Sequence, residues 1–372
     1  MSHISYQGSK RPSSSPRHMK YKTVNKLIMV GNGFDLAHGL KSGFNHFSLN
    51  YIQSVLQEFA LRRQYTDSQI EINLGSDNLD LMPIHVNDDN SFAIFRNMKS
   101  KRIKSQLFEK IIIEIGDKNW VDIEVSFYDL LNFFVEKKYV SDIKKRNSEL
   151  EYIRHLLIEY LKKEEARITI TPHPELLKQF HEPILQREAL LNTIDEDKKV
   201  NSYYLLNFNY TSILKKYADQ MPPSRTTLNH IHGALNTEDS MGQEPIFGFG
   251  DELDKNYSAF EDLRDDSAFE HIKSFKYLEA ENYRNLMEFI EAEPFQVCIF
   301  GHSCGVSDRT MLNKIFEHEN CISIKIYYYQ NGDKNDYTTK NYSIARCFRD
   351  KSSFRNKVVN LERCSPMVQP SQ

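Results

Sequence analysis

Polar and glycine residues follow several short apolar runs of this chain, and their types and spacing suit chemistry. Directly after the apolar run 26–30 comes the turn Gly31-Asn32-Gly33-Phe34-Asp35. Glycine lets backbone N–H groups approach a phosphate, and the amino end of a following helix adds positive potential. The pattern predicts a nucleotide-binding turn, although similar turns also occur in α/β proteins that bind no nucleotide.

Amide and imidazole side chains mark two further turns. Asn207 and Asn209 are two positions apart and should point to one side, as should His230 and His232. An amide can hold a ribose hydroxyl or orient water, and a histidine can transfer a proton near neutral pH. Asparagines that only satisfy a turn, and a purely structural histidine, are the alternatives. His-x-His also binds metals, but spacing fixes no further ligand, so no metal site is predicted.

A second glycine turn, Gly301-His302-Ser303-Cys304-Gly305, precedes a helix predicted over 309–318, with Ser307 or Asp308 as its cap. The turn satisfies the Gly-x-Ser-x-Gly pattern, which suggests a serine hydrolase with Ser303 as nucleophile. That fold expects an acid and then a histidine further along the chain. The histidine after Ser303 is His318, inside the predicted helix, which disfavours this hypothesis.

The single tryptophan, Trp120, lies just before another predicted helix start. Asp122 comes three residues after Asn119, and Trp120 would share a helix face with Glu124. One interpretation is a core tryptophan beside a capped helix. The other is that Trp120, Asp122 and Glu124 reach from a lid toward a cleft.

The elements that must position these groups form an alternating pattern. Strands are predicted over 203–206, 227–231, 245–247, 296–300 and 323–329, and most end at a polar or glycine turn. The carboxyl ends of parallel strands lie along one sheet edge, where ligands bind. We therefore predict an α/β fold with a Rossmann-like, mostly parallel sheet.

Helical spacing over 44–59 and through 101–165 predicts a large helical insertion, and the polar stretch 64–100 predicts a long surface loop or flap. The predicted organisation is a disordered tail over 1–22, a nucleotide-binding core over 23–50 and 196–360, the helical insertion with its loop over 51–195, and a C-terminal tail over 361–372.

Composition excludes several classes of protein. The 372 residues are 40% hydrophobic and 27% charged, with a net charge of −3 and no massed basic stretch, so no nucleic-acid footprint is expected. No apolar run is long enough to span a membrane, and no signal peptide is recognised. The five cysteines include no Cys-x-x-Cys pair. These features predict a cytoplasmic protein with reduced thiols.

Five motifs in order resemble the bacterial abortive-infection AbiH family, which is associated with defence against bacteriophage. They are Val30–Gly39, Trp120–Glu124, Asn207–Thr211, His230–Gly233 and Phe300–Asp308. The series is also similar, more distantly, to sirtuin-like NAD-binding domains. There Gly31 and Gly33 match a glycine loop, Asn209 an Asn-Ile-Asp element, His232-Gly233 the catalytic His-Gly, and Gly301 with Ser303 a Gly-Thr-Ser loop. Thr211 stands where that superfamily has an acid, and the zinc module is missing, so a deacetylase is not expected.

The resemblance implies NAD or a related nucleotide as substrate or ligand, with no other cofactor required. Nicotinamide–ribose cleavage passes through an oxocarbenium-like transition state. Under this hypothesis Asn209 orients water, His232 accepts a proton and Asp35 stabilises positive charge. The nucleotide would contact Gly31, Asn32, Gly33, Phe34, Thr211, Gly301, His302, Ser303 and Asp308.

The alternative from another class is a non-catalytic sensor of ADP-ribose or another nucleotide in phage defence. Both hypotheses expect a phage-derived trigger, and both leave open whether copies of the chain assemble. They differ in turnover, because a sensor is stabilised by its ligand without forming product.

Overall fold

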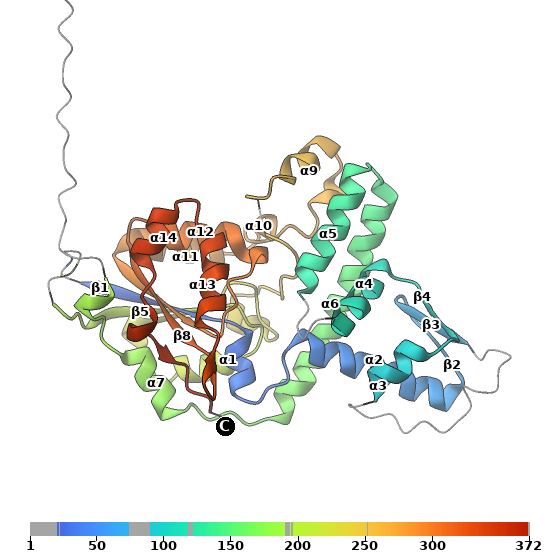
Figure 1. The fold of residues 1–372 in the computed structure, drawn as a ribbon, viewed down its shortest axis with the longest axis horizontal. Helices are drawn as coiled ribbons and strands as arrows, with labels where there is room; N and C mark the ends of the chain where they lie inside the picture. The colour runs from blue at the N-terminus through green and yellow to red at the C-terminus, as the bar shows by residue number, and fades with distance from the viewer. Residues whose placement is uncertain are drawn as a thin grey trace, which may run out of the picture.

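The centre of the molecule is a six-stranded, all-parallel sheet with strand order β11-β8-β7-β1-β5-β6 (Figure 1). The structure is a computed structural model that describes residues 21, 23–73, 90–117, 122–189, 194, 196–250 and 252–370. The predicted Rossmann-like α/β class is confirmed. The strands are β1 Val24–Val30, β5 Val200–Asn207, β6 Thr226–His230, β7 Phe295–Phe300, β8 Cys321–Tyr328 and β11 Ser365–Pro366.

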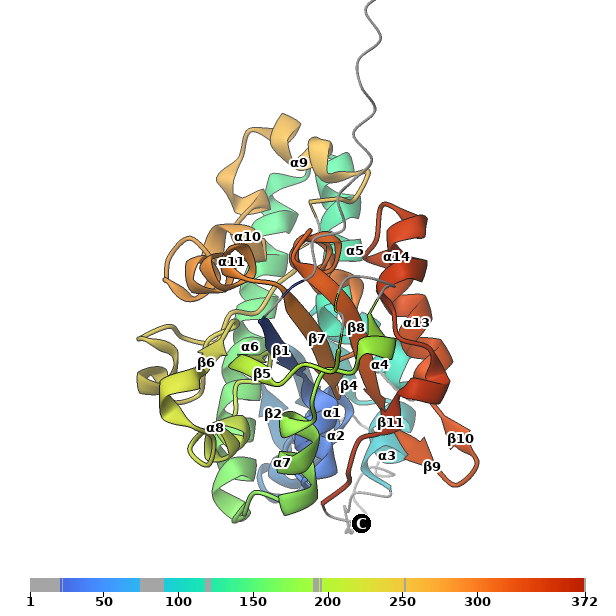
Figure 2. The same cartoon turned by 90° about the vertical axis from the view of Figure 1, so that its left-hand side faces the viewer.

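Helices cover both faces of this sheet (Figure 2). Side chains alternate along β1, so that Leu27 and Met29 enter one core and Ile28 and Val30 the other. The first core includes side chains of α11 Asn282–Ala292, α12 Arg309–Glu317 and α13 Tyr337–Arg346. The second includes side chains of α1 Asn32–Ala37, α7 Pro174–His181 and α8 Ile213–Ala218. Burial on both faces explains the near-continuous apolar runs of these strands.

A second, mainly helical region has its own core and lies on the right of Figure 1. It is built from α2 Phe44–Arg62, α3 Ser91–Asn97, α4 Gln106–Asp117, α5 Ile123–Glu136 and α6 Val140–Arg167. The same core contains side chains from residues 247–272, which include α9 Tyr257–Leu263. Tyr128 of α5 stacks on Phe249 with ring centroids 3.7 Å apart. The helical region therefore packs on loops that follow the sheet strands.

Two predicted elements differ in the structure. Within 64–100, predicted as a loop, β2 Gln64–Thr66 and β3 Ile70–Asn73 join β4 Lys101–Ile103 in a small antiparallel sheet, and residues 74–89 lie outside the described residues. Ile70 and Ile72 are buried at alternate positions. This alternation covers too few residues to be recognised within a polar stretch. Residues 245–247 form no strand, because the Ile246 N–H donates to the carbonyl of His232 in a loop.

Parts of the predicted insertion and of the predicted C-terminal tail belong to the region around the central sheet. Helix α7, within the predicted insertion, packs on the sheet through Leu176 and Phe180. Strand β11, within the predicted C-terminal tail, pairs with β8, and Met367 is buried. The predicted tail over 1–22 and Trp120 lie outside the described residues, except for Tyr21. The remaining α-helices and strands are α10 Lys273–Lys276, α14 Lys351–Lys357, β9 Gln330–Asn331 and β10 Lys334–Asn335.

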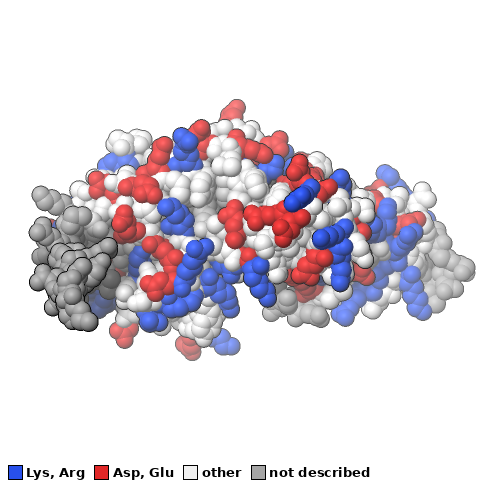
Figure 3. Space-filling model, turned by 90° about the horizontal axis from the view of Figure 1, so that it is seen from above, with Lys and Arg blue, Asp and Glu red and all other residues white. Residues whose placement is uncertain are grey.

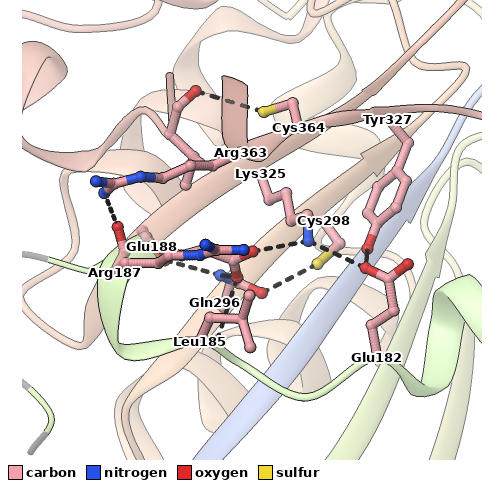
Figure 4. Close-up of polar contacts among 12 residues, drawn as sticks. Glu182, Leu185, Arg187, Glu188, Gln296, Cys298, Lys325, Tyr327, Arg363 and Cys364 are labelled. Atoms are coloured by element: carbon pink, nitrogen blue, oxygen red, sulfur yellow. Dashed lines mark hydrogen bonds and ion pairs between the residues drawn. The ribbon is translucent and has the colours of Figure 1, made fainter. Parts of the chain in front are cut away.

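A buried polar cluster fastens the segment after α7 to the sheet (Figure 4). Lys325 Nζ donates to Glu182 Oε2 at 3.0 Å and to Glu188 Oε1 at 2.8 Å. Tyr327 donates to Glu182 Oε2 at 2.7 Å, and Gln296 donates to Glu188 Oε2 at 3.1 Å. If one partner of a buried ion pair is removed, the other charge is left uncompensated. The segment after α7 is therefore held where its two glutamates meet Lys325.

The surface carries both signs of charge. On the face seen in Figure 3, Lys and Arg are interspersed with Asp and Glu rather than gathered in one basic patch. Across the described part of the chain, none of the helices combines the length and apolar character that crossing a membrane requires.

Candidate functional site

A cavity of about 310 Å³ lies where the carboxyl ends of β1, β5 and β7 face α5 and α6. It brings together most of the predicted site residues, although they come from five separate parts of the chain. Phe34 is instead buried among the rings of His38, Phe180 and Tyr217. The predicted residues that line the cavity are Gly31, Asn32, Gly33, Asp35, Asp122, Glu124, Asn209, Thr211, His232, Gly301, His302, Ser303 and Asp308.

Asp35 is a buried carboxylate held by two side chains from the turn after β5. Its Oδ1 accepts a hydrogen bond from Asn209 Nδ2 at 2.8 Å, and its Oδ2 accepts one from Thr211 Oγ1 at 2.6 Å. Burial raises the pKa of Asp35 to about 7, against the lowering effect of these two hydrogen bonds. Asp35 therefore changes its charge near neutral pH, and Thr211 binds a carboxylate rather than supplying one.

Asn209 orients protein groups. Its Nδ2 also donates to the Gly31 carbonyl at 3.1 Å, and its backbone N–H donates to Asn207 Oδ1 at 3.1 Å. Asn207 Nδ2 lies 3.2 Å from His230 Nδ1, away from the cavity lining. The paired asparagines thus shape the turn that presents Asp35, and Asn207 with His230 supports them from behind.

His232 and Asp308 form an imidazole–carboxylate pair. His232 Nε2 lies 3.2 Å from Asp308 Oδ1 and 3.0 Å from the Tyr277 hydroxyl. Hydrogen bonding of Nε2–H to the carboxylate fixes one tautomer and leaves Nδ1 as the proton acceptor. Gly233, with φ +76°, ends the segment, and a Cβ there would lie 2.2 Å from the Glu244 carbonyl oxygen. The His-Gly motif therefore has a local steric cause.

Lys273, which the sequence motifs did not single out, joins this pair to the helical region. Its Nζ lies 2.7 Å from Glu124 Oε2 and 2.9 Å from Asp308 Oδ1, and its side chain is 1% exposed. Burial alone would raise the pKa of Asp308, but Lys273 and His232 hold it well below its usual range. Glu124 Oε1 also accepts the Gly248 N–H at 3.2 Å. Lys273 lies in the four-residue helix α10, and it has no regular sequence spacing to any of the motifs. Its contacts therefore become visible only in the folded structure.

Asp122 and Glu124 reach the cavity from the start of α5. The Asp122 carboxylate caps this helix by accepting the Val125 N–H at 3.1 Å, and burial raises the pKa of Asp122. Burial also raises the pKa of Glu124, against the attraction of Lys273. The helical region therefore contributes two acidic groups to the cavity lining.

Ser303 and His302 are not arranged as a nucleophile and its base. His302 Nδ1 accepts the Cys304 N–H at 3.0 Å, and its Nε2 lies 3.8 Å from Asp308 Oδ2. Burial lowers the pKa of His302 to about 3. His318 instead packs on Phe295, at the opposite end of β7 from Ser303. The geometry gives the serine hydrolase hypothesis no support.

The two glycine turns pack directly on each other. The Gly31 N–H donates to the Phe300 carbonyl at 3.1 Å, and the Gly33 N–H to the Gly301 carbonyl at 2.9 Å. A Cβ on Gly31 would lie 2.6 Å from His302 Cα, and one on Gly33 would lie 2.8 Å from Gly301 Cα. Close backbone packing therefore accounts for these glycines. Their two N–H groups, predicted to face a diphosphate, are already used within the protein.

The cavity is lined by more acidic than basic groups. Asp35, Asp122, Glu124 and Asp308 line it, while Lys273 contacts two of these four. A negative, largely desolvated lining favours a ligand group that carries or develops positive charge. Among the described residues, no three His, Cys, Asp or Glu side chains are placed to hold a metal ion.

The fold and cavity define a Rossmann-like α/β protein with an acidic, imidazole-containing site at the carboxyl edge of its parallel sheet. Residues 27–330 match the family described as bacteriophage abortive infection AbiH. The chain belongs to this family, as its motifs predicted, and so takes a role in abortive infection. A comparison with curated proteins found no match.

Proposed function

We propose that this protein cleaves the bond between a cationic base and ribose, with the nicotinamide–ribose bond of NAD as its target in phage defence. The observation that carries the proposal is the pairing, in one acidic cavity, of the buried Asp35 carboxylate with the His232–Asp308 pair. These residues supply a negative charge and a proton acceptor, which N-glycosidic hydrolysis requires.

The chemistry needs no acid on the leaving group. As the bond from ribose C1′ to the pyridinium nitrogen breaks, its electron pair neutralises nicotinamide, and positive charge develops on the ribose. Asp35, held by Asn209 and Thr211, stabilises that charge. Water bonds to C1′ and gives its proton to His232 Nδ1. The products are nicotinamide, ADP-ribose and a proton.

The role of Asn209 is revised under this proposal. Its Nδ2 donates to Asp35 and to the Gly31 carbonyl, so it acts as a positioning residue rather than as the group that orients water. Because the Gly31 and Gly33 N–H groups bind carbonyls, support is strongest for the cationic nicotinamide end of the nucleotide. The buried thiols of Cys298, Cys304 and Cys321, which form no disulfide with any described residue, fit a reducing, cytoplasmic location.

The test is nicotinamide release from NAD by the purified chain, alone and with phage-infected lysate. We expect release by the wild type and at least about a hundredfold less by Asp35→Asn and His232→Ala. The matched control is His181→Ala, which removes an exposed histidine on α7 and should retain full activity.

Two outcomes would contradict the proposal. One is absence of release in both conditions, and the other is equal release by wild type and site variants. Thermal stabilisation by ADP-ribose without any turnover would favour the nucleotide sensor instead.

A further inference from the structure

A second, larger hollow of about 1250 Å³ lies beside the candidate site. Phe247 lines both spaces, and Tyr277, whose hydroxyl contacts His232, lines the larger one. The rest of its lining comes from α6, the loop 241–246, Glu270, His271 and the segment 276–287. All the lining residues are among those that the structure describes.

Glutamates outnumber cations around this hollow. Each cation already has a glutamate partner: Arg154 pairs with Glu151, Lys276 with Glu279 and Arg284 with Glu281. The surplus negative charge comes from two further glutamates. Glu244 Oε2 lies 3.9 Å from Arg154 Nη1, Glu270 Oε1 lies 3.9 Å from His271 Nε2, and the two side chains are 75% and 56% exposed. The hollow is therefore complementary in charge to a cationic partner.

A buried hydrogen-bond acceptor in the lining points to the same chemistry. His271 is 8% exposed, and its Nε2 has no hydrogen-bond partner among the described residues. The ring hydrogen bonds to the Phe247 backbone, and burial lowers the pKa of His271, so the neutral imidazole offers Nε2 as an acceptor. A buried acceptor without a partner is costly, and a donor from a bound partner would remove that cost.

Apolar side chains in the same lining exclude a purely ionic partner. Leu278 is 80% exposed and Met241 is 57% exposed, and both lie on the hollow with Met287 and Pro245. Exposed apolar groups beside polar ones are typical of surfaces that bind proteins. A partner that suits this surface carries basic and apolar side chains together.

Stacked rings connect the hollow to the candidate site. Tyr283, which lines the hollow, stacks on Tyr277 with centroids 5.5 Å apart and planes 4° apart. Tyr277 is in turn parallel to His232, with centroids 6.1 Å apart and planes 5° apart. A partner that displaces Tyr283 would therefore disturb the contact between Tyr277 and His232 Nε2.

We propose that this hollow binds a polypeptide segment of basic and apolar residues, and that binding is transmitted to His232 through Tyr283 and Tyr277. The binding step does not depend on which reaction the candidate site performs. Surplus carboxylates, a buried acceptor and exposed apolar groups together define the occupant.

The binding test uses fluorescence anisotropy with the full chain and a labelled octapeptide of alternating arginine and leucine. We expect saturable binding that weakens at least tenfold in the Glu244→Gln/Glu270→Gln variant. The matched control, Glu261→Gln/Asp262→Asn, removes two exposed charges from α9 outside the hollow and should bind like the wild type.

Three results overturn the binding proposal. The first is equal affinity of the wild type and the Glu244→Gln/Glu270→Gln variant. The second is equal affinity for a peptide with citrulline in place of arginine. The third is displacement of the peptide by spermidine at matched charge concentration, which would assign the hollow to a small polycation.

The transmission step is tested by NMR of the histidine ring signals at saturating peptide, with the His232 signal assigned from His232→Gln. The His232 signal should move in the wild type and stay in place in Tyr283→Leu. A His232 signal that does not respond in the wild type, or that moves equally in Tyr283→Leu, overturns this part of the proposal.

Discussion

Asp35 lines the candidate site, and burial of its carboxylate lowers the free energy of unfolding. Its pKa is raised from 3.8 to about 7 in the folded protein, so the folded state binds a proton more readily than the unfolded state. Stability from this group is therefore highest at low pH, and it falls as pH rises from about 4 to 7. Each pKa unit corresponds to about 1.4 kcal/mol, which limits the cost above pH 7 to about 4 kcal/mol.

Asp35→Asn should accordingly stabilise the protein while removing turnover. At pH 8 we expect the free energy of unfolding to rise by about 1–4 kcal/mol, and the gain should shrink toward pH 4. Urea unfolding at a series of pH values measures both effects. In the same pH series, nicotinamide release by the wild type should decline below pH 7, as Asp35 becomes protonated. A variant that is less stable at pH 8 would contradict the assigned burial cost.

Replacing Lys273 is expected to lower the stability of the protein, whereas replacing Asp35 should raise it. Lys273→Met leaves the carboxylates of Glu124 and Asp308 buried without their cation, which should cost about 3–5 kcal/mol. Thermal unfolding measures the loss. Lys276→Met is the control, since Lys276 lies in the same short helix but is 42% exposed, and it should change stability by less than about 0.5 kcal/mol. Similar losses in both variants would argue against the buried ionic link.

At the scale of elements, the contact between the turns after β1 and β7 is the main departure from the predicted nucleotide loop. The sheet order places β1 between β5 and β7, where the strand order reverses and an open crevice is expected. Here the turns at Gly31–Gly33 and Gly301–His302 close that gap through backbone contacts. The cavity lies to one side of this contact, under α5 and α6.

Gly33→Ala should therefore disrupt the turn itself. Its Cβ would lie 2.8 Å from the Gly301 backbone, which cannot move independently of β7. We expect a loss of at least about 2 kcal/mol in urea unfolding. Gly305→Ala, whose Cβ would have only ordinary contacts beyond 3.4 Å, is the matched control. If Gly33→Ala matches that control, the packing does not explain the glycine.

The sequence predicted the strands and strand-end residues well because burial on both sheet faces leaves long apolar runs. β5 and β7 contain the strands predicted for them, β8 contains all but the last predicted residue, and Asn209, His232 and Asp308 meet in one cavity. The prediction was weaker where partners are distant in sequence. Lys273 acquires its role only through residues 149 and 35 positions away. The short strands β2 and β3 show too little alternation to be recognised in a polar stretch.

For the molecule as a whole, the C-terminal segment is a structural part of the sheet. β11 pairs with Tyr327 and Tyr328, Met367 is buried, and Gln179 of α7 donates to the Pro366 carbonyl at 2.8 Å. Removal of residues 365–372 would uncover the edge of β8 and the apolar surface beneath Met367.

Truncation after Cys364 should lower the unfolding midpoint and increase aggregation on heating. We expect a loss of about 2–4 kcal/mol, of which burial of Met367 contributes roughly 1.5–3 kcal/mol. Urea unfolding and light scattering measure the two effects. Truncation after residue 370, which keeps every described residue of the segment, is the control. Equal stability of the two truncated chains would show that β11 contributes little.

The candidate site is assembled from residues that are far apart in the order of synthesis. Asp35 is made first, Asn209 and His232 follow, and Asp308 is made last of the four. A ribosome must therefore add all the residues from 35 to 308 before all of these groups exist. Under the proposed function, unfinished chains and premature stop products cannot deplete the NAD of the cell that makes them. Under that function, the scattered order of the site delays activity until residue 308 has been added.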